Sequence, residues 1–230
     1  MTSSSLLRRS HIISLAHGFT DSDKKLWRDI ELLAGEFWRS QPDNQLRAWH
    51  HLLMAVGNFK RPGGTIIRIP TLEGTLPQDV EARPEVDIPG PSDRLSVNEP
   101  ETWSGLEDNT RGLGVATTTT LLSALWPGHH VVIDQRALRA AIARSVNEWQ
   151  PSFPLQDTDK RVDWPCYGWY RPKLLHTAKA ECCAPVEVER ALFMLDRKVP
   201  RKREGTRSWG KYAEDIDGIL RSESLDDPSE

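Results

Sequence analysis

Two glycines and one aspartate stand in an order suited to chemistry on a phosphate-bearing ligand. In Gly112-Leu113-Gly114 the glycines enclose one residue before an expected helix, and Asp134 lies twenty residues further on, before another expected helix. Glycine permits a positive φ and a close approach of the backbone to a ligand. The following helix N-terminus offers unpaired N–H groups and a partial positive charge, which favour an anion. The spacing predicts a phosphate-holding turn followed by a carboxylate.

Each half of this pattern also has a simpler interpretation. A Gly-X-Gly sequence before a helix is often an ordinary turn between two helices. Asp134 precedes Gln-Arg-Ala-Leu-Arg, and aspartate is a preferred N-cap residue that stabilises a helix by about 1 kcal/mol. The cap and a chemical role are compatible, and the wider sequence favours the chemical role.

The apolar residues recur mostly at helical spacing, which predicts an all-α fold. In the segment 46–56, for example, Leu46, Trp49, Leu52, Leu53 and Val56 fall on one helix face. No repeat of fixed period is visible. The other expected helices run from Thr20-Asp21-Ser22 to Trp38 and over 101–109, 115–125, 134–146, 167–182 and 186–195, the last opening at Ala184-Pro185.

Residues 61–100 interrupt this helical pattern. Proline and glycine cluster there, and only Thr65 to Ile69 alternates like a short strand. A segment of this length without regular structure is usually functional or mobile in a compact domain. We therefore expect a long loop insertion within a helical domain.

Length and composition indicate one helical domain over residues 1–200 and a basic-then-acidic tail over 201–230. The 230 residues are 38% hydrophobic, enough for one good core. The apolar stretch from Ile12 to Ala16 is too short for a signal peptide, and no run approaches the length of a membrane span. We expect a cytoplasmic protein without membrane association, and no protein partner is inferable. Three cysteines cannot supply four thiolates, so we expect no metal and no cofactor.

The charges are unevenly distributed although the net charge is only −3. Acidic residues concentrate in 73–108 and 214–230, whereas Arg136, Arg139 and Arg144 share one short helix and a basic run extends from 197 to 211. Basic clusters of this kind suit a nucleic-acid backbone. They are equally typical of solvated faces.

The segment 106–140 resembles a known family. Arg-Gly-Leu-Gly-Val-Ala-Thr-Thr-Thr-Thr-Leu-Leu at 111–122 and Val-Val-Ile-Asp-Gln-Arg at 131–136 resemble the hairpin and catalytic aspartate of the helix-hairpin-helix DNA glycosylase superfamily. The segment 174–195 is similar to closing helices of bacterial 8-oxoguanine DNA glycosylase-like proteins. The resemblance covers about a third of the chain. It implies double-stranded DNA as partner, with DNA contacts from Gly112, Leu113, Gly114, Val115, Ala116, Thr117 and Arg136.

The implied reaction is hydrolysis of an N-glycosidic bond, with Asp134 as the catalytic carboxylate. Such a bond breaks through an oxocarbenium-like transition state, which a carboxylate near C1′ stabilises while it orients the attacking water. Bifunctional members carry a lysine two residues after the second hairpin glycine, where this chain has Ala116. An alanine cannot form a Schiff base. We therefore expect a monofunctional enzyme that leaves an abasic site in an intact strand.

Chemistry on a base requires its extrusion from the stack into a pocket. Candidate pocket residues are Thr120, one helical turn after Ala116, and the aromatic Trp164, Tyr167 and Trp169. Most tryptophans are more often core residues. His129-His130 is more typical of a polar turn than of a metal pair, because adjacent side chains converge poorly on one ion.

The long polar loop favours a modified base, such as a glucosylated hydroxymethylcytosine of phage DNA removed in antiviral defence, over a small damaged base. A non-catalytic helix-hairpin-helix module that only binds DNA is an alternative. A helical protein-interaction domain with an incidental hairpin is a more distant one.

Overall fold

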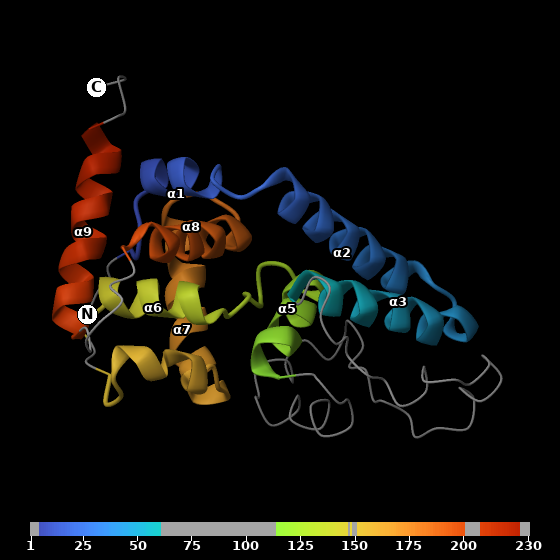
Figure 1. Ribbon diagram of the computed structural model, residues 1–230. Helices are drawn as coiled ribbons and strands as arrows, with labels where there is room; N and C mark the ends of the chain where they lie inside the picture. The colour runs from blue at the N-terminus through green and yellow to red at the C-terminus, as the bar shows by residue number, and fades with distance from the viewer. Residues whose placement is uncertain (1–4, 61–113, 147, 149–150, 201–207, 226–230) are drawn as a thin grey trace. The chain divides into compact units, whose positions relative to one another are not determined.

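The computed structural model describes residues 5–60, 114–146, 148, 151–200 and 208–225 (Figure 1). Every named element in these residues is helical, which confirms the predicted all-α class for the described part of the chain. None of these helices is both long and apolar enough to cross a bilayer. The elements are α1 (Arg9–Ala16), α2 (Asp21–Arg39), α3 (Pro42–Lys60), α5 (Val115–Leu125), α6 (Gln135–Arg144), the 3-10 helix η4 (Leu155–Arg161), α7 (Trp164–Ala180), α8 (Pro185–Lys198) and α9 (Trp209–Leu225).

Several expectations fall outside the described residues. These are the loop insertion at 61–100 with its short strand from Thr65 to Ile69, the helix at 101–109, and the first two hairpin residues, Gly112 and Leu113. The structure therefore describes the predicted hairpin only from Gly114 onward.

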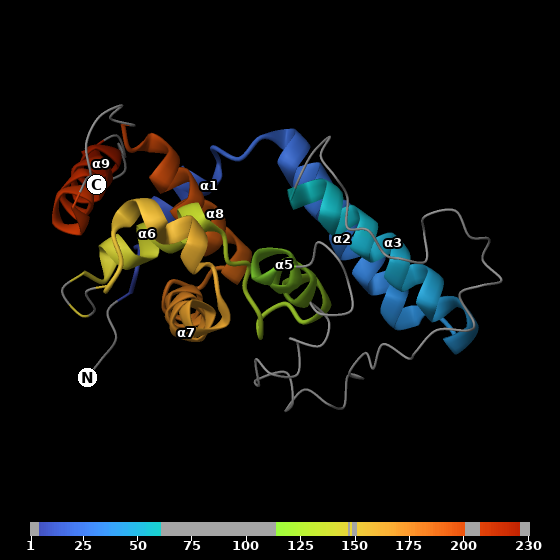
Figure 2. The same cartoon turned by 60° about the horizontal axis from the view of Figure 1, so that its bottom comes forward.

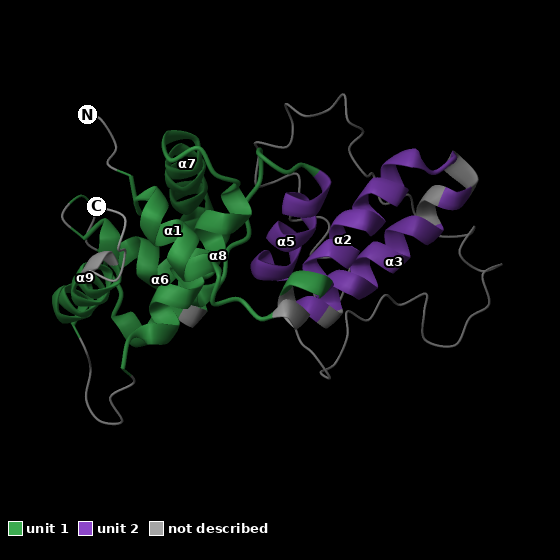
Figure 3. Cartoon of the chain, turned by 90° about the horizontal axis from the view of Figure 1, so that it is seen from above, with its two compact units in different colours: residues 1–25, 126–230 green, residues 26–125 purple. Residues whose placement is uncertain are grey.

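The chain divides into two compact units (Figure 3). Unit 1 comprises Met1–Lys25 and Trp126–Glu230, and unit 2 comprises Leu26–Leu125. The single domain expected over residues 1–200 therefore includes parts of both units. A composition average over the whole chain carries no information on such a division, because each unit buries its own apolar faces.

Unit 2 is built on aromatic contacts between α2 and α3. Phe37 packs on Trp49 with ring centroids 5.7 Å apart, and Trp27 packs on Phe59 at 5.6 Å. Helix α5 packs against α3, and the Trp38 indole N–H donates to the Leu125 carbonyl at 3.2 Å. The helical face predicted for 46–56 is confirmed by the burial of Trp49, Leu52, Leu53 and Val56.

In unit 1, α6 lies beside α8, as Figures 1 and 2 both show. Ala137, Ala140 and Ala141 of α6 are fully buried, and their small side chains allow a close approach of the neighbouring backbone. Helices α1 and α7 also pack on α8. The predicted opening of α8 is confirmed, because Pro185 stands in its first turn.

Both ends of the chain contribute helices to unit 1. The N-terminal segment forms α1, with Ile12 and Leu15 buried. Residues 209–225 lie within the tail expected over 201–230, but they form α9 and bury Tyr212, Ile216 and Leu220. These three recur every four residues and so share one helix face. The segment therefore has an apolar helix face to bury, although most of its other residues are polar or charged.

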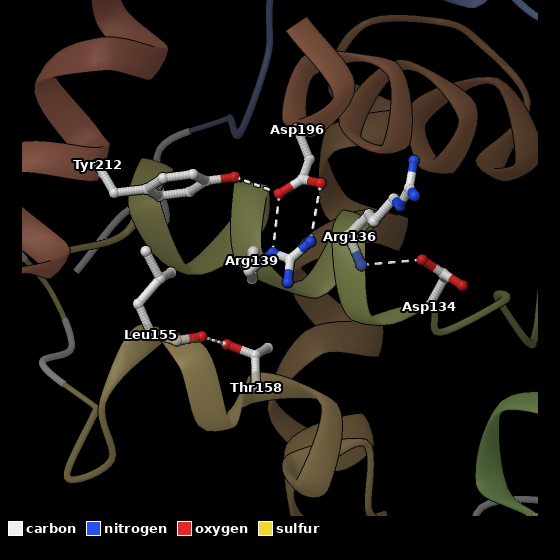
Figure 4. A network of polar contacts seen from close by, with 7 residues as sticks. All are labelled: Asp134, Arg136, Arg139, Leu155, Thr158, Asp196 and Tyr212. Atoms are coloured by element: carbon white, nitrogen blue, oxygen red, sulfur yellow. Dashed lines mark hydrogen bonds and ion pairs between the residues drawn. The ribbon is translucent and has the colours of Figure 1, made fainter. Parts of the chain in front are cut away.

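A buried polar network joins α6, α8 and α9 (Figure 4). The Arg139 guanidinium donates to both carboxylate oxygens of Asp196, at 2.8 and 2.9 Å. The Tyr212 hydroxyl donates to the same carboxylate at 2.5 Å, and burial together with the Asp196 charge raises the pKa of Tyr212. Asp196 is 8% exposed, so its charge is stabilised by these donors rather than by water. The network fixes the position of α6, whose first residues adjoin Asp134.

Candidate active site

Asp134 is the N-cap residue of α6 (Figure 4). Its backbone is extended, and its Oδ1 accepts the backbone N–H of Arg136 at 2.8 Å. Val131, Val132 and Ile133 immediately before it are buried and anchor the approach to the helix. The cap predicted from the sequence is confirmed, and it holds the carboxylate in one orientation.

The cap uses only one of the two carboxylate oxygens. Among the described residues, Oδ2 of Asp134 has no hydrogen-bond partner, and the side chain is partly exposed. A carboxylate fixed at one oxygen and open at the other is suited to orient a water or to face a developing positive charge. The structural and chemical roles can therefore coexist in this residue.

Tyr170 of α7 interacts electrostatically with Asp134 and with Glu189 of α8. Burial raises the pKa of Tyr170 well above its usual value, and the charges of Glu189 and then Asp134 raise it further. Tyr170 is completely buried, and within the part of the chain that the structure describes its hydroxyl has no hydrogen-bond partner. Glu189 is only 7% exposed. A buried hydroxyl without a partner among the described residues therefore lies within electrostatic range of both carboxylates.

We expect the Tyr170→Phe variant to be as stable as the parent protein or more stable by up to about 1 kcal/mol. The substitution removes a buried hydroxyl that has no hydrogen-bond partner among the described residues. Tyr167→Phe is the matched control, and we expect it to lose about 1–3 kcal/mol because its hydroxyl is hydrogen-bonded. Urea unfolding of both variants measures the difference. Equal losses in the two variants would contradict the assignment of an unpartnered Tyr170.

Tyr167, a predicted pocket residue, is part of a packed aromatic group with His130 and Trp164. Its hydroxyl lies 2.8 Å from Nδ1 of His130 and accepts the Val131 N–H at 3.4 Å. The rings of Tyr167 and His130 are parallel at 6.2 Å, and Trp164 meets Tyr167 edge-on at 5.6 Å. Tyr167 is 3% exposed, whereas Trp164 is partly exposed. Of this pair, Trp164 is better placed to reach a ligand.

His130 is a buried neutral residue rather than part of an exposed turn. It is 1% exposed, and burial, followed by the charges of Arg171 and His129, lowers its pKa to about 3. Neutral imidazole is the form that accepts or donates one hydrogen bond at each nitrogen. No cluster of three or more metal-ligating side chains occurs among the residues that the structure describes.

This lowered pKa makes stability depend on pH. Between about pH 6.5 and pH 3, His130 is protonated in the unfolded chain but not in the folded chain. The unfolded state therefore binds more protons, and the free energy of unfolding decreases as the pH is lowered. We expect a contribution of up to about 1.4 kcal/mol per pH unit in this window. Urea unfolding from pH 7 to pH 4, compared with His130→Gln, isolates it. An unchanged slope in the variant would refute the assignment.

The predicted DNA contacts at the start of α5 belong to unit 2. The Gly114 carbonyl accepts the N–H groups of Thr117 and Thr118, each at 2.9 Å, so Gly114 starts the helix. Its φ is not positive, and a Cβ built there would meet no atom of the described residues within 4 Å. The open space allows close approach of a ligand, but the conformation of Gly114 itself does not require glycine. Val115, Ala116 and Thr117 are partly exposed in the first turn.

Thr120 and Trp169, the remaining pocket predictions, have partners of their own. Thr120 is fully buried, and its hydroxyl donates to the Ala116 carbonyl at 2.8 Å, the back-bonding expected of threonine in a helix. The Lys173 ammonium lies 5.6 Å from the ring centroid of Trp169. Its Nζ also forms an ion pair with Oε2 of Glu148 at 2.5 Å. Lys173 is thereby engaged in a charge pair and is a poor substitute for the missing amine nucleophile.

Sequence reasoning missed Tyr170 and Glu189. A signal existed for both: Tyr170 follows Tyr167 by one helical turn, and Glu189 precedes the buried Asp196 by two turns on the apolar face of α8. Acids at apolar positions of a helix are unusual because burial of a charge is costly without partners. Such positions indicate either an internal ion pair or a functional carboxylate.

No protein-family model, no curated protein and no solved structure matches this chain. The likeness to helix-hairpin-helix glycosylases thus remains a prediction from short motifs. Functional assignment depends on the chemistry of the residues around Asp134.

Proposed function

We propose that this protein is a monofunctional DNA glycosylase that hydrolyses the N-glycosidic bond of a damaged or modified base in double-stranded DNA. The observation that carries the proposal is the carboxylate of Asp134, held through Oδ1 by the α6 cap and open at Oδ2. The buried hydroxyl of Tyr170, which has no partner among the described residues, interacts electrostatically with both Asp134 and the buried Glu189. A fixed anion beside buried polar groups is a common arrangement in sites that stabilise a developing cation.

In the proposed reaction Asp134 faces C1′ of an extruded nucleotide. Its negative charge stabilises the oxocarbenium-like sugar as the C1′–N bond breaks, and Oδ2 orients the incoming water. The water oxygen forms the new bond to C1′, the electron pair of the broken C1′–N bond stays on the base nitrogen, and a proton from the water neutralises that nitrogen. The products are the free base and an abasic site.

The absence of an amine at position 116 supports the monofunctional assignment. Ala116 stands where a lyase-competent member would have lysine, and Lys173 is held by Glu148 and Trp169. Without an amine no Schiff base forms, and the strand is not cleaved by β-elimination.

Mass spectrometry of released bases tests this function and its substrate class. The protein is incubated with glucosylated phage DNA and, separately, with oxidised plasmid DNA. A glucosylated hydroxymethylcytosine among the products supports antiviral base excision, whereas release of 8-oxoguanine alone supports repair and excludes the phage substrate. Binding of both DNAs without release of any base would support the alternative, a non-catalytic DNA-binding module.

A further inference from the structure

The three arginines of α6 have different surroundings. Arg139 is paired with Asp196, and Arg144 is paired with Asp217. The Arg136 guanidinium has no carboxylate partner among the described residues, although the backbone N–H of this residue donates to the capping carboxylate of Asp134. Of these three positive charges, only that of Arg136 is not neutralised within the described part of the chain, and it is the one adjacent to the candidate active site.

Arg136 belongs to a cluster in which arginines and phenylalanines alternate, here called the Arg–Phe cluster. Its guanidinium lies 5.2 Å from the ring centroid of Phe193. Phe193 contacts the ring of Phe19 at 5.5 Å, and the guanidinium of Arg190 lies 5.4 Å from that second ring. All four side chains are partly exposed. The cluster therefore links α6, α8 and the segment after α1 on unit 1.

Stacking on an aromatic ring prepares an arginine for a phosphate. The ring covers one face of the planar guanidinium and restricts its rotation, while the N–H donors remain available in the plane. These in-plane donors match the geometry of phosphate oxygens. Because the arginine is already ordered, less side-chain entropy is lost when a phosphate binds. At Arg136, the phenylalanine ring thus orders the guanidinium without neutralising its charge.

We propose that the Arg–Phe cluster binds the phosphate backbone of duplex DNA beside the extruded nucleotide. The inference rests on the proposed function, because it takes DNA as the partner of the site at Asp134. It extends that function to Phe19, Phe193 and Arg190, which no motif of the sequence marks. Arg136 contacts the phosphate nearest the site, and Arg190 contacts a neighbouring one.

The test is equilibrium binding of a duplex that carries a tetrahydrofuran abasic analogue, measured against salt concentration. All proteins carry Asp134→Asn, so that catalysis does not affect the measurement. Arg136→Gln and Arg190→Gln should each weaken binding about tenfold, as expected for loss of one charged hydrogen bond. Each should also lower the slope of log K against log salt by about 0.9 per lost phosphate contact. Phe193→Leu should weaken binding about threefold with both arginines present, because the stacked order is lost.

Arg221→Gln, which removes an exposed arginine of α9, is the matched charge control and should leave affinity and slope nearly unchanged. The proposal is overturned if Arg190→Gln and Phe193→Leu behave like Arg221→Gln. It is also overturned if polyglutamate competes with DNA as effectively at equal charge concentration, which would indicate a general anion surface. Excision by the otherwise wild-type protein is measured separately. The cluster can therefore fail while the glycosylase function stands, and the reverse outcome is equally recognisable.

Discussion

Asp134→Asn is expected to reduce base excision by about 10²- to 10⁴-fold while leaving the fold and DNA binding intact. Asparagine caps a helix about as well as aspartate does, so the Arg136 N–H keeps its acceptor. The variant loses only the negative charge that would face the oxocarbenium-like sugar. Single-turnover excision rates and urea midpoints, measured on the same preparations, separate chemistry from stability.

Asp163→Asn is the matched control for this experiment. Asp163 is the N-cap residue of α7, and its Oδ1 accepts the Cys166 N–H at 2.8 Å, the same role that Asp134 has in α6. We expect excision by this variant to match that of the wild-type protein. Equal rates for both variants would mean that Asp134 is only a cap.

The largest effect on stability is expected for Asp196→Ala, at about 3 kcal/mol of the free energy of unfolding. The substitution leaves the largely buried Arg139 guanidinium without its two acceptors and removes the acceptor of the Tyr212 hydroxyl. A buried charge left without its partner is costlier than the pair is favourable. Because the network joins α6, α8 and α9, we expect α9 to become more accessible to proteolysis as well.

Two further variants are compared with Asp196→Ala to show how much of the stability loss comes from the whole network. Tyr212→Phe removes one donor and keeps the Arg139 pair, so about 1–2 kcal/mol is expected. Asp217→Ala removes the exposed partner of Arg144, and less than about 1 kcal/mol is expected. If urea unfolding gave Asp196→Ala no greater loss than Asp217→Ala, the network would not hold α9 in place.

The central helices could be predicted from the sequence because their signals are local. Asp134 before an amphipathic run predicts the start of α6, and Pro185 predicts the start of α8. Helices α1 and α9 were not predicted, since α1 is short and α9 lies among many charges. Their apolar residues become a buried face only when α6 and α8 are present to cover them.

The candidate site was predicted only in part, for a related reason. Asp134 follows from its place before a helix, whereas Tyr170, whose pKa it raises together with Glu189, comes from α7, and Glu189 comes from α8. Helical spacing gives the face of each residue but not the partner that the face meets. The same limit applies to the arginines of α6, because only tertiary contacts distinguish Arg136, which has no carboxylate partner among the described residues, from Arg139, which is paired with Asp196.

The most direct test of the proposed glycosylase is a comparison of strand cleavage with and without alkali. End-labelled duplex DNA containing the base identified by mass spectrometry is incubated with the wild-type protein and analysed before and after treatment with hot alkali. We expect an intact strand before alkali and a break at the modified nucleotide after it, with no break in either lane for Asp134→Asn. Cleavage before alkali would contradict the water-based mechanism, and no alkali-labile site with wild-type protein would contradict glycosylase activity.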